Sequence, residues 1–312
     1  MQKTLSRPVV VVALCLLCNC LWGLGFPAIT LGYRALSMDS GDIPSILLFA
    51  GLRFMVGAAA ILLFGSLFER RPLVPGKGDW HGIVLQAFVQ TVAQYVLMYV
   101  GLTLTTPVHT AIINGSSVFF AILVTALLFR QEALTGRKLL GCIVGFSGIL
   151  IMNLDGLSAG GKDVLLGDLL TLAATVTVAF AASITRKYTA RTDPLIFGGW
   201  QLLIGGAVMA GAGFLLGGRV GFSSPQAWGA FGMLVFITAV ADPLWATLLK
   251  YNSVSKITVF LLTLPLFGVI MTVLLLGNDG QIFRPATLAA MVLVCLGILA
   301  INLPEKAKAR RP

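Results

Sequence analysis

The chain has 312 residues, of which 57% are hydrophobic and 11% are charged, and its mean hydropathy is +0.94. Soluble globular domains carry about 25% charged residues, so this composition excludes a soluble protein and indicates an integral membrane protein. The net charge of +10 is not arranged as a basic groove with base-reading side chains, so we expect no nucleic-acid partner. All five cysteines lie within apolar runs, which predicts buried thiols and no metal or other cofactor.

Apolar runs long enough to cross the ~30 Å hydrocarbon core recur along the whole chain. They predict ten transmembrane helices, at residues 8–30, 44–67, 80–102, 106–129, 137–154, 164–185, 194–217, 227–249, 254–276 and 285–303. The third connection, residues 103–105, is so short that the third and fourth helices must form an antiparallel hairpin. The first run follows Lys3 and Arg7 as in a signal peptide, but no small-residue cleavage site comes after it, so we expect a retained helix.

The distribution of Lys and Arg predicts how these helices are oriented. If both ends of the chain lie in the cytoplasm, 17 Lys and Arg fall on the cytoplasmic side and 4 on the outer side, with Arg53 inside a helix. Membrane proteins carry their excess of positive charge in cytoplasmic connections. The sequence therefore predicts cytoplasmic N- and C-termini.

An internal repeat divides the chain into two halves. Residues 106–132 align without a gap to residues 253–279, and both copies end in an acidic residue. Residues 49–59 match 197–207, and 148–153 match 297–302, at nearly the same spacing. We therefore expect an all-α integral membrane fold with two repeats of five helices, residues 1–155 and 156–312. Because five is odd, the repeats face opposite ways, which is typical of secondary transporters with a substrate site near the midplane.

Several motifs, in their order along the chain, give it a resemblance to a known family. They are Trp22-Gly23 with Phe26 in the first predicted helix, Arg53-Phe54 in the second, Gly167-Asp168 at the start of the sixth, and small residues in the fourth and ninth, which end near an acid. This pattern resembles the EamA-like branch of the drug/metabolite transporter superfamily over essentially the whole chain. That family often has proline midway along the fourth and ninth helices. Pro265 keeps it, but Val118 stands at the first position, so a hinge is expected in the ninth helix alone.

The resemblance implies a secondary transporter that moves small metabolites by alternating access, with a multi-pass location in the bacterial cytoplasmic (inner) membrane. Export of amino acids or related metabolites is the first expectation, protons are a candidate coupling ion, and the assembly is a monomer or a homodimer. An exporter of drugs or other cationic compounds is the alternative, followed by an uptake carrier for another small solute. Small multidrug relatives place an acid in the first helix, where this chain has Asn19, so simple drug/proton exchange is disfavoured.

Polar side chains inside membrane helices are costly and are therefore candidates for function. Asp242 is the only carboxylate deep within a predicted helix, and Pro243 loosens the backbone next to it. It is either a site for a substrate ammonium or a coupling proton, or a structural acid that pairs with Arg53. Gln86, Gln90 and Gln94 share one face of the third helix. The predicted cavity residues are Asn19, Trp22, Gln90, Gln94, Tyr95, Asn114, Ser117, Trp200, Gln201, Asp242 and Trp245.

Two other classes of protein are less consistent with the sequence. Residues 145–148 match the GxSG pattern of intramembrane serine proteases, but His109 is expected to lie shallower than Ser147, so Gly141 and Gly145 are better explained by close helix packing. His109 itself either contacts substrate or makes interfacial hydrogen bonds. No metal or nucleotide motif is present, so we expect no enzyme. A channel usually forms its pore by symmetric oligomerisation, whereas this chain carries its own internal pseudo-symmetry.

Overall fold

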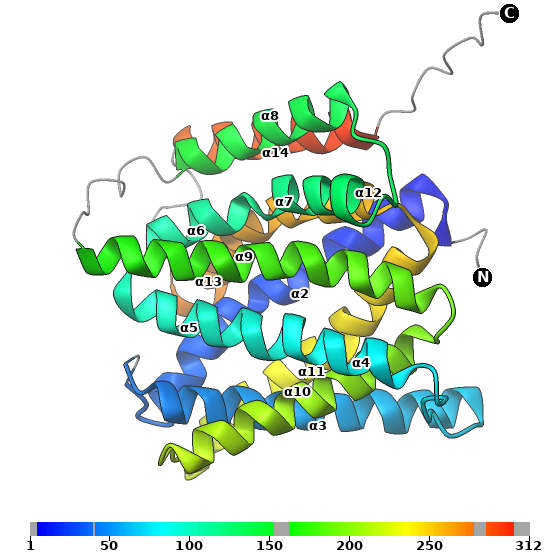
Figure 1. Ribbon diagram of the computed structural model, residues 1–312. Helices are drawn as coiled ribbons and strands as arrows, with labels where there is room; N and C mark the ends of the chain where they lie inside the picture. Colours follow the sequence, from blue (N-terminus) through cyan, green and yellow to red (C-terminus); the bar gives the residue numbers. More distant parts are fainter. Residues whose placement is uncertain (1–4, 40, 106, 153–161, 278–284, 303–312) are drawn as a thin grey trace, which may run out of the picture.

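The computed structural model describes residues 5–302 except for 40, 106, 153–161 and 278–284, and every regular element in these residues is a helix (Figure 1). Seven helices or runs of helices are long and apolar enough to cross a membrane: Pro8–Ala35, Ile43–Glu69, Trp80–Leu104, Asp163–Thr189, Pro194–Leu215, Pro225–Tyr251 and Val254–Leu276. Shorter apolar helices cover Ile113–Leu128 and Leu288–Asn302. The chain is thus a multi-pass integral membrane protein, and its exposed leucine and phenylalanine side chains suit contact with lipid.

The elements occupy every range in which the hydropathy predicted a helix, as far as those ranges are described. In chain order they are α2 (Pro8–Ala35), α3 (Ile43–Glu69), α4 (Trp80–Gln86), η1 (Ala87–Ala93), α5 (Gln94–Leu104), α6 (Pro107–Gly115), α7 (Ser117–Leu123), η2 (Val124–Leu128), α8 (Gly136–Met152), α9 (Lys162–Thr189), α10 (Pro194–Leu215), α11 (Pro225–Tyr251), α12 (Val254–Thr258), η4 (Val259–Thr263), α13 (Leu264–Leu276) and α14 (Pro285–Asn302). Elements η1 and η2 are π-helical, and η4 is a 3₁₀ helix.

Local signals in the sequence explain where several helices begin. The side chains of Asp42, Asp193 and Ser224 accept hydrogen bonds from backbone N–H groups in the first turns of α3, α10 and α11. Each of these helices also has a proline in its first turn, where a missing N–H leaves no hydrogen bond unmade. The caps therefore fix the registers of the helices that carry Arg53 and Asp242.

Glycines let two pairs of helices approach closely, α3 with α10 and α8 with α14, which lie at opposite edges of the bundle in Figure 1. A Cβ atom on Gly51 would lie 2.6 Å from the carbonyl oxygen of Gly206, and one on Gly297 would lie 2.6 Å from that of Gly141. Gly141 and Gly145 therefore serve helix packing, as predicted. The hydroxyl of Ser147 donates to the carbonyl oxygen of Val144 at 2.7 Å, within its own helix.

We expect the substitution Gly51→Ala to destabilise the protein by about 1–3 kcal/mol, because the added methyl group forces α3 and α10 apart. Gly211→Ala is the matched control, since it lies on α10 and nothing stands within 4 Å of its Cβ position. Thermal unfolding of the purified proteins in detergent measures both effects. The control should melt at the wild-type temperature or slightly above it, and equal melting of the two variants would contradict the packing described here.

The remaining long helices cross between these two pairs. Helix α2 packs against α11 and α13, and α9 packs against α5, α6 and α7. The helical run at residues 107–128 is interrupted at Ser116 and then widens into η2, although it contains no proline after Pro107. The ninth predicted helix contains η4 just before Pro265. Irregular backbone thus occurs in both of these helical runs, and the hinge expected in the ninth helix stays a prediction.

Candidate substrate cavity

A small cavity lies where α2, α4, η1, α9, α10 and α11 meet. Its lining residues are Trp22, Gln86, Gln90, Thr185, Phe197, Gly198, Gln201, Asp242, Trp245 and Ala246. The open volume is ≈ 30 Å³, which is about the share of one water molecule in the liquid. A metabolite would fit only if the surrounding helices moved apart.

Asp242 is the charged group of this cavity. Its Oδ1 accepts a hydrogen bond from the indole Nε1–H of Trp22 at 3.3 Å, which joins α11 to α2. The rings of Trp22 and Trp245 meet edge to face, with centroids 5.0 Å apart. The carboxylate therefore lies beside two packed indole rings, and such a site suits a cation that carries an apolar group.

Amide and hydroxyl groups make up the rest of the cavity's polar lining. Gln86 donates through Nε2 to the hydroxyl of Thr185 at 2.8 Å and to the carbonyl oxygen of Ala181 at 3.2 Å, and it also bonds the side chain of Gln90. Gln201 accepts a hydrogen bond from Thr91 at 2.8 Å. No Lys or Arg lines the cavity in the described part of the chain, so its only charge is negative.

Five residues predicted from the sequence line this cavity together: Trp22, Gln90, Gln201, Asp242 and Trp245. Gln94 does not, although it was expected to share a face with Gln86 and Gln90. The reason is η1, since a residue added to a π-turn rotates all later residues of the helix by about 100° round its axis. Thr185, Phe197, Gly198 and Ala246 were missed, and Phe197 could have been found because it opens one of the repeat matches.

Other predicted residues lie outside the cavity lining. Asn19 is fully buried and donates to the carbonyl oxygen of Cys15 in its own helix at 2.8 Å. Trp200 donates to the carbonyl oxygen of Leu73 at 2.8 Å and so faces the connection after α3. Asn114 accepts a hydrogen bond from Thr175 at 3.0 Å, which joins α6 to α9, and Ser117 is buried at the start of α7.

Arg53 and Tyr95 form a site of their own beside the cavity. The guanidinium of Arg53 lies over the ring of Phe54, 4.5 Å from its centroid, and 5.9 Å from the centroid of Tyr95. No ion pair within 4.0 Å joins Arg53 to Asp242 or to another carboxylate among the described residues. Their helices nevertheless pack against each other, and a Cβ atom on Gly57, one turn after Arg53, would lie 2.9 Å from Cγ2 of Thr238, one turn before Asp242. The structure thus places them close together without direct contact.

At one end of the bundle, α6 and α9 are joined by hydrogen bonds to Asp168. Its carboxylate contacts Nδ1 of His109 at 2.8 Å and also bonds the hydroxyl of Thr105. A Cβ atom on the neighbouring Gly167 would lie 2.7 Å from the backbone nitrogen of Thr105. His109 therefore makes a bond between helices, which is one of the two roles considered for it.

At the opposite end, Glu132 joins three elements, and we call this group the Glu132 cluster. Its carboxylate contacts Lys138 Nζ at 2.9 Å, Arg186 Nη1 at 3.3 Å and the hydroxyl of Ser255 at 2.5 Å. Burial raises the pKa of Glu132, but the hydrogen bonds from Lys138 and Ser255 outweigh burial and hold that pKa below its ordinary value. Arg186 also donates to the carbonyl oxygen of Asn252 at 2.5 Å.

Comparison with known proteins gives a consistent picture. The model of the EamA-like transporter family matches residues 10–154 and, a second time, residues 165–303. The chain is 24% identical over 291 residues to the transporter YvbV of Bacillus subtilis, covering 92% of this chain and 90% of the relative. It is 26% identical over 278 residues to a probable amino-acid metabolite efflux pump of Escherichia coli, covering 85% and 86% of the two chains. A solved crystal structure matches with a TM-score of 0.74 at 17% identity, over 94% of this chain and 97% of the other.

Proposed function

The chain belongs to the EamA-like transporter family, whose members transport solutes and are not enzymes, and from this premise we propose that it is a secondary carrier exporting amino acids or related metabolites by alternating access. The observation that carries the proposal is the cavity around Asp242. Residues from both predicted repeats line it, and it combines one carboxylate with amide and aromatic side chains. The efflux pump named among its relatives favours the same substrate class.

We further propose that ten helices span the membrane as two inverted repeats, residues 1–155 and 156–312. The helix contacts support this, because exchanging the repeats leaves the packing pattern unchanged. The second helix of each repeat forms the pair α3 with α10, and the fifth forms the pair α8 with α14. Helix α2 meets α11 in the same way that α9 meets α5. The family model also matches the chain twice, once in each half.

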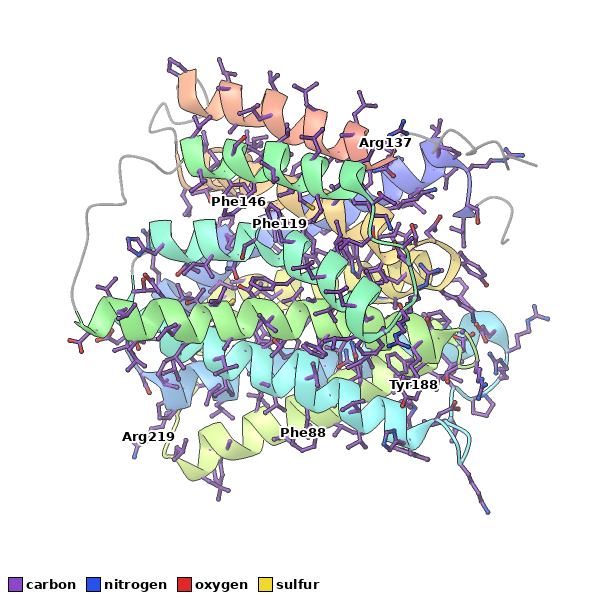
Figure 2. The ribbon with its side chains drawn as sticks, turned by 45° about the horizontal axis from the view of Figure 1, so that its top comes forward. Phe88, Phe119, Arg137, Phe146, Tyr188 and Arg219 are labelled. Atoms are coloured by element: carbon purple, nitrogen blue, oxygen red, sulfur yellow. The ribbon has the colours of Figure 1, made fainter. Side chains whose placement is uncertain are left out.

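The orientation with both termini in the cytoplasm agrees with the arrangement in space. Figure 1 places the first turn of α2 and the last turn of α14 at the same end of the bundle. In Figure 2, Arg137 and Tyr188 lie at that end, and Arg219 lies at the opposite end. Arg137 precedes the membrane region of α8 in a strongly basic connection, whereas Arg219 is one of few outer cations. The bacterial relatives favour the cytoplasmic membrane as the location.

Contacts at the two ends of the bundle support the proposal of alternating access. In the proposed orientation, the Glu132 cluster lies at the cytoplasmic end and the contacts of Asp168 lie at the outer end. Each set joins elements of the two repeats, Glu132 with Arg186 and Asp168 with His109. Breaking one set at a time would open the cavity to one side only. The carboxylate of Asp242 is the candidate site for a transported ammonium or a coupling proton.

We expect everted vesicles that contain this protein to take up a radiolabelled mixture of L-amino acids with saturation, and to show counterflow when preloaded with unlabelled amino acids. Vesicles prepared without the protein are the control. A carrier binds and releases its solute at one site, whereas a channel shows neither saturation nor counterflow. Uptake equal to that of the control vesicles would rule out amino-acid export, and saturable flux of a cationic dye instead would favour the drug exporter.

A further inference from the structure

Arg53 is a buried cation that contacts no counterion in the part of the chain that the structure describes. The residue is 6% exposed, and its Nε atom is buried with no hydrogen-bond partner in the described part of the chain. Arg186 on α9 shows the contrast, since its guanidinium bonds both Glu132 and the carbonyl oxygen of Asn252. Arginine keeps its proton in proteins, so Arg53 remains charged inside the bundle.

The contacts that Arg53 does make do not compensate for burying its charge. Removing a guanidinium from water carries a large desolvation cost, which is recovered only by close anions and hydrogen bonds. The faces of Phe54 and Tyr95 attract the cation, but cation–π contacts recover a small part of that cost. The five N–H groups of arginine are arranged to hold a planar carboxylate. An unpaired arginine inside a transporter is therefore suited to an anionic group that arrives with the solute.

The surroundings of Arg53 supply further donors for such a group. The guanidinium lies over the ring of Tyr95 on α5, and Tyr33 on α2 and Tyr99 on α5 pack in the same apolar cluster as Phe54 and Tyr95. No hydrogen bond from their hydroxyls is made within the described residues. A phenolic hydroxyl is a good donor to a carboxylate. Apolar rings thus surround the guanidinium, and the phenolic hydroxyls add hydrogen-bond donors.

The position of Arg53 relative to Asp242 carries the inference. Helices α3 and α11 pack together at this level, since a Cβ atom on Gly57, one turn after Arg53, would lie 2.9 Å from Cγ2 of Thr238, one turn before Asp242. No ion pair within 4.0 Å joins the Asp242 carboxylate to the guanidinium among the described residues. The negative group on α11 and the positive group on α3 therefore lie at neighbouring levels of two packed helices. We propose that Arg53 binds the carboxylate of the transported solute while Asp242 binds its ammonium. The carrier then selects zwitterions of the amino-acid class, an inference that rests on the proposed function and narrows it.

The first test compares substrates with and without a carboxylate. Uptake of the radiolabelled L-amino-acid mixture is measured in everted vesicles, with unlabelled amino acids or the corresponding amino-acid amides as competitors. We expect the amides, which keep the ammonium, to compete about tenfold less well with wild-type protein. In R53Q we expect the KM for amino acids to rise about tenfold or more, and amides and free acids to compete equally. The KM of R53K should fall between those of wild type and R53Q. The control R219Q changes an exposed residue of the α10–α11 connection and should behave as wild type.

The second test separates substrate binding from a structural role. Because Arg53 has no close anion, replacing it with glutamine should leave the melting temperature of the purified protein unchanged or raise it. A lower melting temperature together with lost uptake would mean that Arg53 holds the fold together, and it would overturn the proposal. Wild-type protein that accepts amides and acids equally, or an unchanged KM in R53Q, would also overturn it while amino-acid export stands. Absence of any wild-type uptake would instead refute the proposed function itself.

Discussion

Asp242→Asn should lower the uptake of amino acids by about 100-fold while the protein still folds. The loss is expected because asparagine cannot balance the charge of a bound ammonium in a cavity that has no other negative group. Folding should survive because the Oδ1 atom of asparagine can still accept the hydrogen bond from Trp22. Uptake in everted vesicles and melting of the purified protein measure the two effects. Asp163→Asn, at an exposed position in the first turn of α9, is the control.

The same variant tests whether Asp242 exchanges protons. If it does, wild-type uptake should depend on pH between about pH 5 and 9, because the carboxylate binds either a proton or the solute, and the residual uptake of Asp242→Asn should be flat over that range. Unchanged uptake in the variant at every pH would reduce Asp242 to a structural acid that holds α11 against α2. Lost uptake with an unfolded protein would lead to the same conclusion.

Glu132→Gln should destabilise the protein by about 2–4 kcal/mol, because it leaves the charges of Lys138 and Arg186 without their shared counterion. The Glu132 side chain is only 5% exposed, so water replaces little of what is lost. Glu69→Gln is a fair control. Glu69 also pairs with an arginine, Arg71, but on an exposed surface, where such pairs contribute about 0–1 kcal/mol. Equal melting of the two variants would contradict the role assigned to the Glu132 cluster.

The dependence of the melting temperature on pH under acidic conditions gives an independent check on the role of Glu132. Its pKa is lower in the folded protein than in the unfolded chain, where it is about 4.3. The cluster therefore stabilises the fold fully above that value, and the stabilisation is lost as the pH falls through the folded pKa. We expect the difference in melting temperature between wild type and Glu132→Gln to shrink below about pH 4. A difference that stays constant down to acidic pH would mean that another group accounts for it.

The positions of the helices could be predicted from the sequence, because the length of an apolar run and the placement of Lys and Arg are direct consequences of the bilayer. The irregular backbone within the helices could not be predicted from the sequence. Element η1 contains neither glycine nor proline, and it lies where α9 and α10 pack against the chain. Its effect is large, since it turns Gln94 away from the face that Gln86 and Gln90 present to the cavity.

Only part of the candidate cavity could be predicted, because some of its residues stand out in the sequence and others depend on contacts between distant segments. Asp242 and Trp22 stand out because a lone carboxylate and a deep indole are rare inside membrane helices. The direction of Trp200 depends instead on the carbonyl group of Leu73, which lies 127 positions earlier in the chain. Glu132 was noticed as the acid that ends one repeat copy, but its bonds to Arg186 and Ser255 depend on how the two halves meet. Contacts between repeats cannot be read from a motif within one repeat.

The most direct test of the carrier account is the labelling of a single cysteine at Gln90, in a variant whose five native cysteines are replaced. A membrane-impermeant maleimide is applied to right-side-out and to everted vesicles. Because Gln90 lines the cavity, which we propose lies between two repeats, we predict that it is labelled from either side and that the L-amino-acid mixture slows labelling from both. Labelling from one side only, or from neither, would contradict a cavity that opens alternately to the two faces of the membrane.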